Sequence, residues 1–83
     1  MFELEVVTVQ ADTASGHPVR QLRVAKTMLE AEELARDIVS ANTHIAVTHV
    51  VRDSVRLGMR SLAFVSPVGI VGFANIAEVP DGA

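Results

Sequence analysis

The chain has 83 residues, of which 49% are hydrophobic, 20% are charged and 4% are aromatic, and it contains no cysteine. This length supports one small domain, and the lack of cysteine excludes a disulfide framework and a zinc-thiolate site. A formal net charge of −3, a pI near 5.4 and three phenylalanines as the only aromatic residues make nucleic acid and an anionic membrane poor partners, so we expect neither.

The first strand is expected over residues 2–9. Apolar side chains at even positions alternate there with Glu3 and Glu5, which is the period of a strand with one wet face. This acidic start lacks the positive region of a secretory signal, and the chain lacks a span of about 20 apolar residues. We therefore expect a cytoplasmic protein without a transmembrane helix.

Residues 10–18 are small and polar, contain Gly and Pro, and predict a mobile connection. Asp12, Ser15 and His17 within it have the side-chain types of a hydrolytic triad. A triad needs a rigid scaffold and oxyanion donors, which such a loop does not supply, and the Gly-x-Ser-x-Gly pattern is absent. We expect no catalytic residue and a protein that is not an enzyme.

A second strand over 19–25 is expected to form a hairpin with the first, and a helix over 28–41 follows it. Thr27 and Glu30 have the spacing of a capping box, and Asn42 is a reasonable left-handed terminator. The apolar side of the helix consists of Ala31, Leu34, Ala35, Ile38 and Ala41. Because this side is rich in alanine, the helix can lie close against a sheet.

The remaining chain predicts strands only, apart from one ambiguous segment. Residues 44–51 are rich in β-branched side chains, and 62–66 and 70–77 flank a turn at 67–69. Residues 54–60 fit either a helix or a strand. Gly72, next to Phe73, permits close packing.

His44 and His49 are the candidate metal ligands in this region. Their separation by five residues places them on opposite faces of a regular strand, so we expect no metal site and no cofactor. Should His49 lie in an interface, association would depend on pH, because charging a buried imidazole is costly.

The pattern predicts an α+β fold with a single helix packed on one face of an antiparallel sheet, in the order ββαβ followed by a C-terminal hairpin. It forms a single domain over 1–83 with a C-terminal tail at 79–83. The later strands are apolar on both faces, whereas one helix covers only one face. An uncovered apolar face remains, and a chain this short without disulfides gains stability from association.

The leading hypothesis is therefore a small protein-interaction module that self-associates, as a dimer before any larger oligomer, through an apolar sheet face or edge. The expected contact residues are Val50, Val65, Val71 and Phe73, with Phe73 as the anchor because aromatic burial dominates interfaces.

The alternative is a compact inhibitor or accessory protein, of the kind that mobile elements encode, which binds a larger macromolecular complex through charge. Its surface would combine an acidic helix face with a row of arginines. These residues are Glu30, Glu33, Asp37, Arg52, Arg56 and Arg60. A solvated rim, or pairing of the arginines with the acidic face of a second copy, explains the same pattern. A third possibility is a small-molecule site between subunits near His44 or His49.

Overall fold

The computed structural model describes residues 1–9, 18–56 and 58–80, and of these the side chains other than those of 54–56. The elements in chain order are β1 (Phe2–Thr8), β2 (Val19–Ala25), α1 (Met28–Thr43), β3 (His49–Arg56), β4 (Met59–Ser66) and β5 (Gly69–Glu78). Residues 10–17 of the expected connection at 10–18, with its triad-like residues, and residues 81–83 of the expected tail at 79–83 lie outside the described residues.

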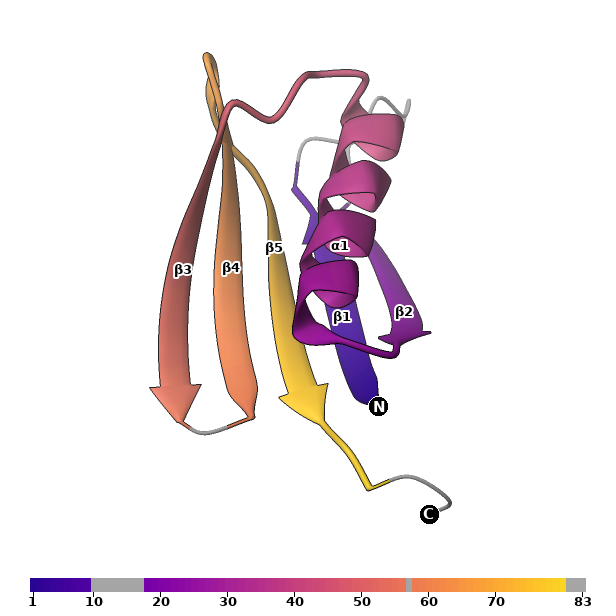
Figure 1. Cartoon of the computed structure of the whole chain (residues 1–83). Coiled ribbons are helices and arrows are strands. Elements are labelled where there is room, and N and C mark those ends of the chain that lie inside the picture. The colour runs from indigo at the N-terminus through magenta and orange to yellow at the C-terminus, as the bar shows by residue number, and fades with distance from the viewer. Residues whose placement is uncertain (10–17, 57, 81–83) are drawn as a thin grey trace.

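The strands form one five-stranded antiparallel sheet in the order β2-β1-β5-β4-β3. The last strand of the chain, β5, lies in the middle, between β1 and β4. A single helix, α1, packs on one face of the sheet over β1, β2 and β5 (Figure 1). The predicted α+β architecture is confirmed.

The start of α1 follows the capping prediction with one difference. The Thr27 hydroxyl accepts a hydrogen bond from the Glu30 backbone N–H at 3.1 Å, as expected for an N-cap. The Glu30 carboxylate, however, accepts from the backbone N–H of Lys26 at 3.3 Å rather than from that of Thr27. The Glu30 carboxylate thus bonds to Lys26, the residue before the N-cap.

The end of α1 lies beyond the predicted residue 41. The Thr43 hydroxyl donates to the Val39 carbonyl at 2.8 Å and accepts from the Ile45 N–H at 3.2 Å, so the last turn continues through Thr43. The left-handed residue is His44, with φ of 57°, and not Asn42. His44 is thereby the C-cap of the helix, and the prediction that it begins a strand is wrong.

The third strand begins at His49, five residues later than predicted. The β-rich segment before it crosses from α1 to the far edge of the sheet (Figure 1) and buries Val47, which is 5% exposed. The Arg36 guanidinium donates to the Val47 carbonyl at 2.7 Å and holds this crossing against the helix. The ambiguous segment at 54–60 contains the end of β3, a turn at Gly58 with φ of 77°, and the start of β4.

The core lies between α1 and one face of the sheet. Its largest fully buried side chains are Phe64, Leu4, Ile76, Val6, Val39 and Val71. The helix lies close to the sheet over Gly72, where an added Cβ would lie 2.6 Å from Cγ2 of Val39. All of this core is on the helix side, so α1 does not shield the side chains on the other face of the sheet from solvent.

Candidate functional site: the open face of the sheet

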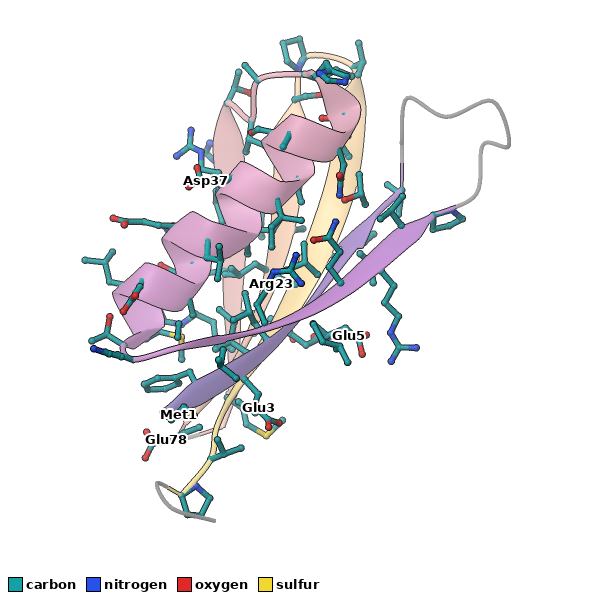
Figure 2. The ribbon with its side chains drawn as sticks, turned by 90° about the vertical axis from the view of Figure 1, so that its right-hand side faces the viewer. Met1, Glu3, Glu5, Arg23, Asp37 and Glu78 are labelled. Carbon is teal, nitrogen blue, oxygen red and sulfur yellow. The ribbon has the colours of Figure 1, made fainter. Side chains whose placement is uncertain are left out.

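The two faces of the sheet differ in burial, and β1 shows the difference most directly. Its even-numbered residues Leu4 and Val6 lie under α1 and are 2% and 0% exposed, whereas Glu3, Glu5 and Val7 alternate with them. We call the face that carries Glu3, Glu5 and Val7 the open face, because no described element covers it. Figure 2 shows Glu3 and Glu5 on the side of the sheet away from α1.

An apolar row crosses the open face from strand to strand. Val7 pairs with Phe73, Phe73 pairs with Ala63, and Ala63 pairs with Val51. A second pair, Val65 with Ile70, adjoins this row near the β4–β5 turn. We call these six residues the apolar patch: Val7, Val51, Ala63, Val65, Ile70 and Phe73.

Three members of the apolar patch expose large fractions to solvent. Phe73 is 42% exposed, Ile70 is 46% exposed and Val51 is 51% exposed. They come from β5 and from the edge strand β3, and the register connects them through partly buried neighbours. Aromatic and β-branched side chains that adjoin across strands in this way form a continuous apolar surface. An uncovered surface of this kind is a candidate contact site.

The row of the open face next to the apolar patch is polar. Glu5 pairs with Asn75, Asn75 with Ser61, and Ser61 with Asp53. The Ser61 hydroxyl donates to the Asn75 side-chain carbonyl at 3.0 Å, and Glu5 forms an ion pair with Arg20 of β2. We call the part of the open face from this row onward the polar half; beyond the row it also contains apolar residues beside Glu3, namely Val24, Ala77 and Met59.

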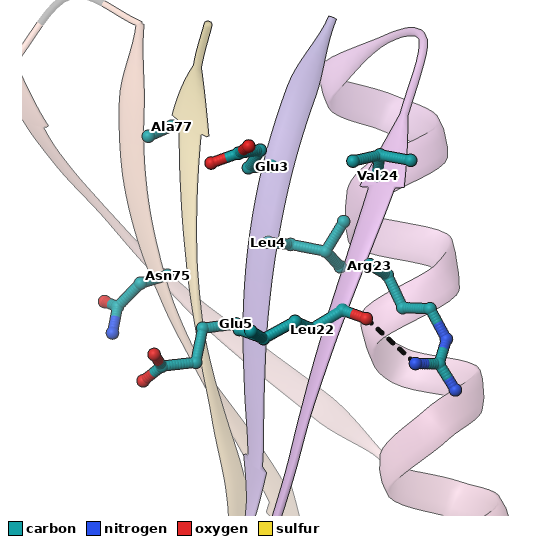
Figure 3. Close-up of a pocket in the computed structure, with 8 residues that line it drawn as sticks. All are labelled: Glu3, Leu4, Glu5, Leu22, Arg23, Val24, Asn75 and Ala77. Atoms are coloured by element: carbon teal, nitrogen blue, oxygen red, sulfur yellow. Dashed lines mark hydrogen bonds between the residues drawn. The ribbon is translucent and has the colours of Figure 1, made fainter.

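The polar half contains a hollow of about 590 Å³ beside the edge strand β2. Glu3, Glu5, Leu22, Val24 and Asn75 are among its lining residues (Figure 3). Leu22 and Val24 are 66% and 58% exposed. They contribute apolar surface to this hollow, whose lining also contains the carboxylates of Glu3 and Glu5.

The predicted contact residues divide between the two faces. Val65 and Phe73 belong to the apolar patch. Val50 lies on the helix side, where it pairs with Phe64 and packs against the core, and Val71 is completely buried. Neither Val50 nor Val71 is part of the open face, and this part of the predicted surface is corrected.

A β-bulge explains why Val71 is misplaced by the sequence pattern. The register between β4 and β5 shifts between Phe64 and Val65, which leaves β5 with one extra residue. As a result Val71 and Gly72 are both buried, although strict alternation would place them on opposite faces. The patch members Val7, Val51, Ala63 and Ile70 were missed as contact residues. Their shared face becomes visible only once the strand register is known.

The arginine row is engaged within the chain. Arg52 and Arg60 lie on the helix side, and both donate to the Glu32 carboxylate, at 2.9 Å and 3.2 Å. The Glu32 side chain is only 11% exposed, and the prediction did not include it. The side chain of Arg56 lies outside the described part of the structure. The single Glu32 carboxylate thus offsets one of the two arginine charges, and the Arg52 side chain remains 54% exposed.

The acidic helix face remains in water: Glu30, Glu33 and Asp37 are all exposed. Asp37 lies on α1, on the opposite side of the molecule from Glu3 and Glu5 (Figure 2). The structure therefore separates this acidic face from the open face.

Neither His44 nor His49 adjoins the hollow. His44 caps α1, His49 begins β3 and is exposed, and both are missing from the hollow's lining residues. Among the described side chains, no three His, Asp or Glu groups come close enough together to hold a metal ion.

Comparisons with protein-family models, with curated proteins and with solved structures found no match. In the described part of the chain, no helix has the length and apolar character that crossing a membrane requires.

Proposed function

We propose that this protein is an interaction module that self-associates by packing its apolar patch against the same patch of a second copy. The observation that carries this proposal is the exposure of Phe73, which remains 42% accessible at the middle of an apolar row. Large exposed apolar surfaces are uncommon on solitary soluble proteins and mark sites of contact.

The exposed part of Phe73 sets the scale of the contact. An aromatic side chain buries about 150–250 Å², so 42% corresponds to about 60–105 Å². At about 25 cal/mol/Å², covering this area contributes about 1.5–2.6 kcal/mol per protomer. A twofold contact uses the residue twice. Association costs about 4–15 kcal/mol in lost freedom, and the two Phe73 side chains together contribute only about 3–5 kcal/mol, so the rest of the patch must take part.

The placement of charges supports a second copy as the partner. The apolar patch itself contains no charged side chain, and Glu3 and Glu5 lie in the polar half of the open face. Two patches can therefore meet without burying a carboxylate, which would be costly. A twofold contact needs a self-complementary surface, and a purely apolar patch meets this condition.

The test compares two substitutions that add the same charge to exposed apolar residues. Phe73→Asp places the charge in the patch, and Leu29→Asp places it on α1, where Leu29 is 66% exposed. Sedimentation equilibrium should give Leu29→Asp the average mass of the unmodified protein, and Phe73→Asp a smaller one. Far-UV circular dichroism confirms that both remain folded. Equal masses for all three proteins would refute the contact through the patch.

The alternative function is charge-based binding to a larger complex, and the exposed acidic face of α1 supports it. It has less support from the arginines, because Arg52 and Arg60 already pair with Glu32. Capture from a lysate at low salt and loss at raised salt would favour this alternative, since exposed charges are screened by salt.

A further inference from the structure

The strand β3 is an edge of the sheet, and its outer side has no described neighbour. In Figure 1 it forms the margin of the sheet opposite β2. Edge strands present unpaired N–H and C=O groups to another strand, and proteins usually block them with Pro, with charged side chains, above all Lys, or with bulges. Between His49 and Asp53, β3 contains no proline, no lysine and no bulge, and its charged residues are Arg52, which pairs with Glu32, and Asp53.

The regular part of β3 is centred on Val51, with two residues on either side. Its register with β4 is continuous from His49 to Asp53 and shifts between Asp53 and Arg56. If two copies of this segment pair antiparallel with full overlap, Val51 meets Val51. His49 then meets Asp53, and Val50 meets Arg52, each of these pairs occurring twice.

Every pairing in this register is favourable. The imidazole of His49 can donate to the Asp53 carboxylate, and both side chains are exposed on the open face. Val51 is 51% exposed and gains an apolar neighbour. The Arg52 guanidinium is held by Glu32, so its aliphatic stem can cover Val50.

The neighbouring registers are worse. A shift of two residues in one direction places Arg52 opposite Arg52, and like charges directly opposite each other destabilise a strand pair. A shift in the other direction places Val50 opposite Val50 and leaves Asp53 beyond the regular segment of the partner. Only full overlap matches His49 with Asp53.

We infer that β3 pairs with β3 of a second copy, centred on Val51, to give one continuous sheet through both copies. The twofold axis stands perpendicular to the sheet, because residues that oppose each other come from the same face. The row that ends at Val51 thereby continues into the same row of the second copy. This contact is separate from the contact through the apolar patch, and both open faces remain accessible.

The experiment uses the full chain with Phe73→Asp as the background, so that contacts through the patch are weakened. We expect this protein to approach a dimer of twice 8.9 kDa at high concentration. Adding His49→Asp places carboxylates opposite each other and should lower the mass toward 8.9 kDa. Adding Asp53→Lys as well restores opposite charges and should restore the dimer. Circular dichroism checks that each variant is folded.

The inference is overturned if the Phe73→Asp protein has a mass of 8.9 kDa at every concentration, or if His49→Asp leaves its dimer unchanged. It is also overturned if Asp53→Lys fails to restore a dimer that His49→Asp has removed. If Phe73→Asp lowers the average mass and His49→Asp does not lower it further, only the edge contact is contradicted. If His49→Asp lowers the average mass and Phe73→Asp does not, only the proposed contact through the patch is contradicted.

Discussion

The close approach of α1 to the sheet predicts that Gly72→Ala destabilises the protein. A Cβ at Gly72 would lie 2.6 Å and 3.0 Å from the two Cγ atoms of Val39, and 3.0 Å from the carbonyl oxygen of Val7. Val39 is fully buried, and the χ1 angle of a valine in a helix is restricted, so its side chain cannot turn away. The helix must therefore move outward or the strand must distort.

Overpacking of this kind costs about 1–3 kcal/mol in the free energy of unfolding. Loss of glycine's freedom in the unfolded chain offsets at most about 1 kcal/mol of that cost. For a domain of this size, each kcal/mol corresponds to a shift of about 4–8 °C in Tm. Urea unfolding followed by far-UV circular dichroism measures the effect, at one fixed protein concentration because association also stabilises the folded chain.

The double variant Gly72→Ala with Val39→Ala is the matched control. Val39→Ala alone leaves a cavity, and the methyl group that Gly72→Ala adds should fill part of it. The cost of the double variant should therefore be smaller than the sum of the two single costs. An unchanged urea midpoint for Gly72→Ala, or strictly additive costs of the two substitutions, would refute the close contact between Val39 of α1 and Gly72 of β5.

Three further predictions concern the N-cap, the ion pairs of Glu32 and the two faces of the sheet. Thr27→Ala removes the N-cap acceptor and should lower the free energy of unfolding by about 0.5–2 kcal/mol, whereas Thr27→Ser should keep most of it; equal urea midpoints for the two variants would contradict this. Glu32→Gln should weaken the interactions of residue 32 with Arg52 and Arg60 and lower Tm. The decrease in Tm should be larger at low salt than at high salt, because salt screens ion pairs. A decrease that does not depend on salt would contradict this prediction. Val71→Ala should cost roughly 2–3 kcal/mol in stability, whereas Val65→Ala should act mainly on the average mass; the reverse pattern would show that the two faces are assigned wrongly.

The sequence was sufficient to predict the order of elements and the class of fold. Strands of period two, a capping signal at Thr27 and a turn at 67–69 are local features, and the structure contains all of them. The start of β3 was not predictable in this way. Residues 44–48 have the composition of a strand, but they cap the helix and cover the core instead, and only tertiary packing decides between these uses.

The candidate site was predicted in outline and corrected in detail. An uncovered apolar face follows from one helix on a sheet of two-sided strands, and Phe73 lies on that face. Val71 was assigned to it because alternation was assumed to be unbroken, and the bulge in β5 removes that assumption. The ion pairs of Glu32 join residues 20 and 28 positions apart, and no local pattern indicates such a distant pair.

The most direct test of the central claim is the molar mass of the unmodified protein over a dilution series, measured by light scattering or sedimentation. The account predicts an average mass above 8.9 kDa at high concentration that decreases toward that value on dilution. A mass of 8.9 kDa at every concentration, with normal circular dichroism, would show that the apolar patch is stable in water without a second copy.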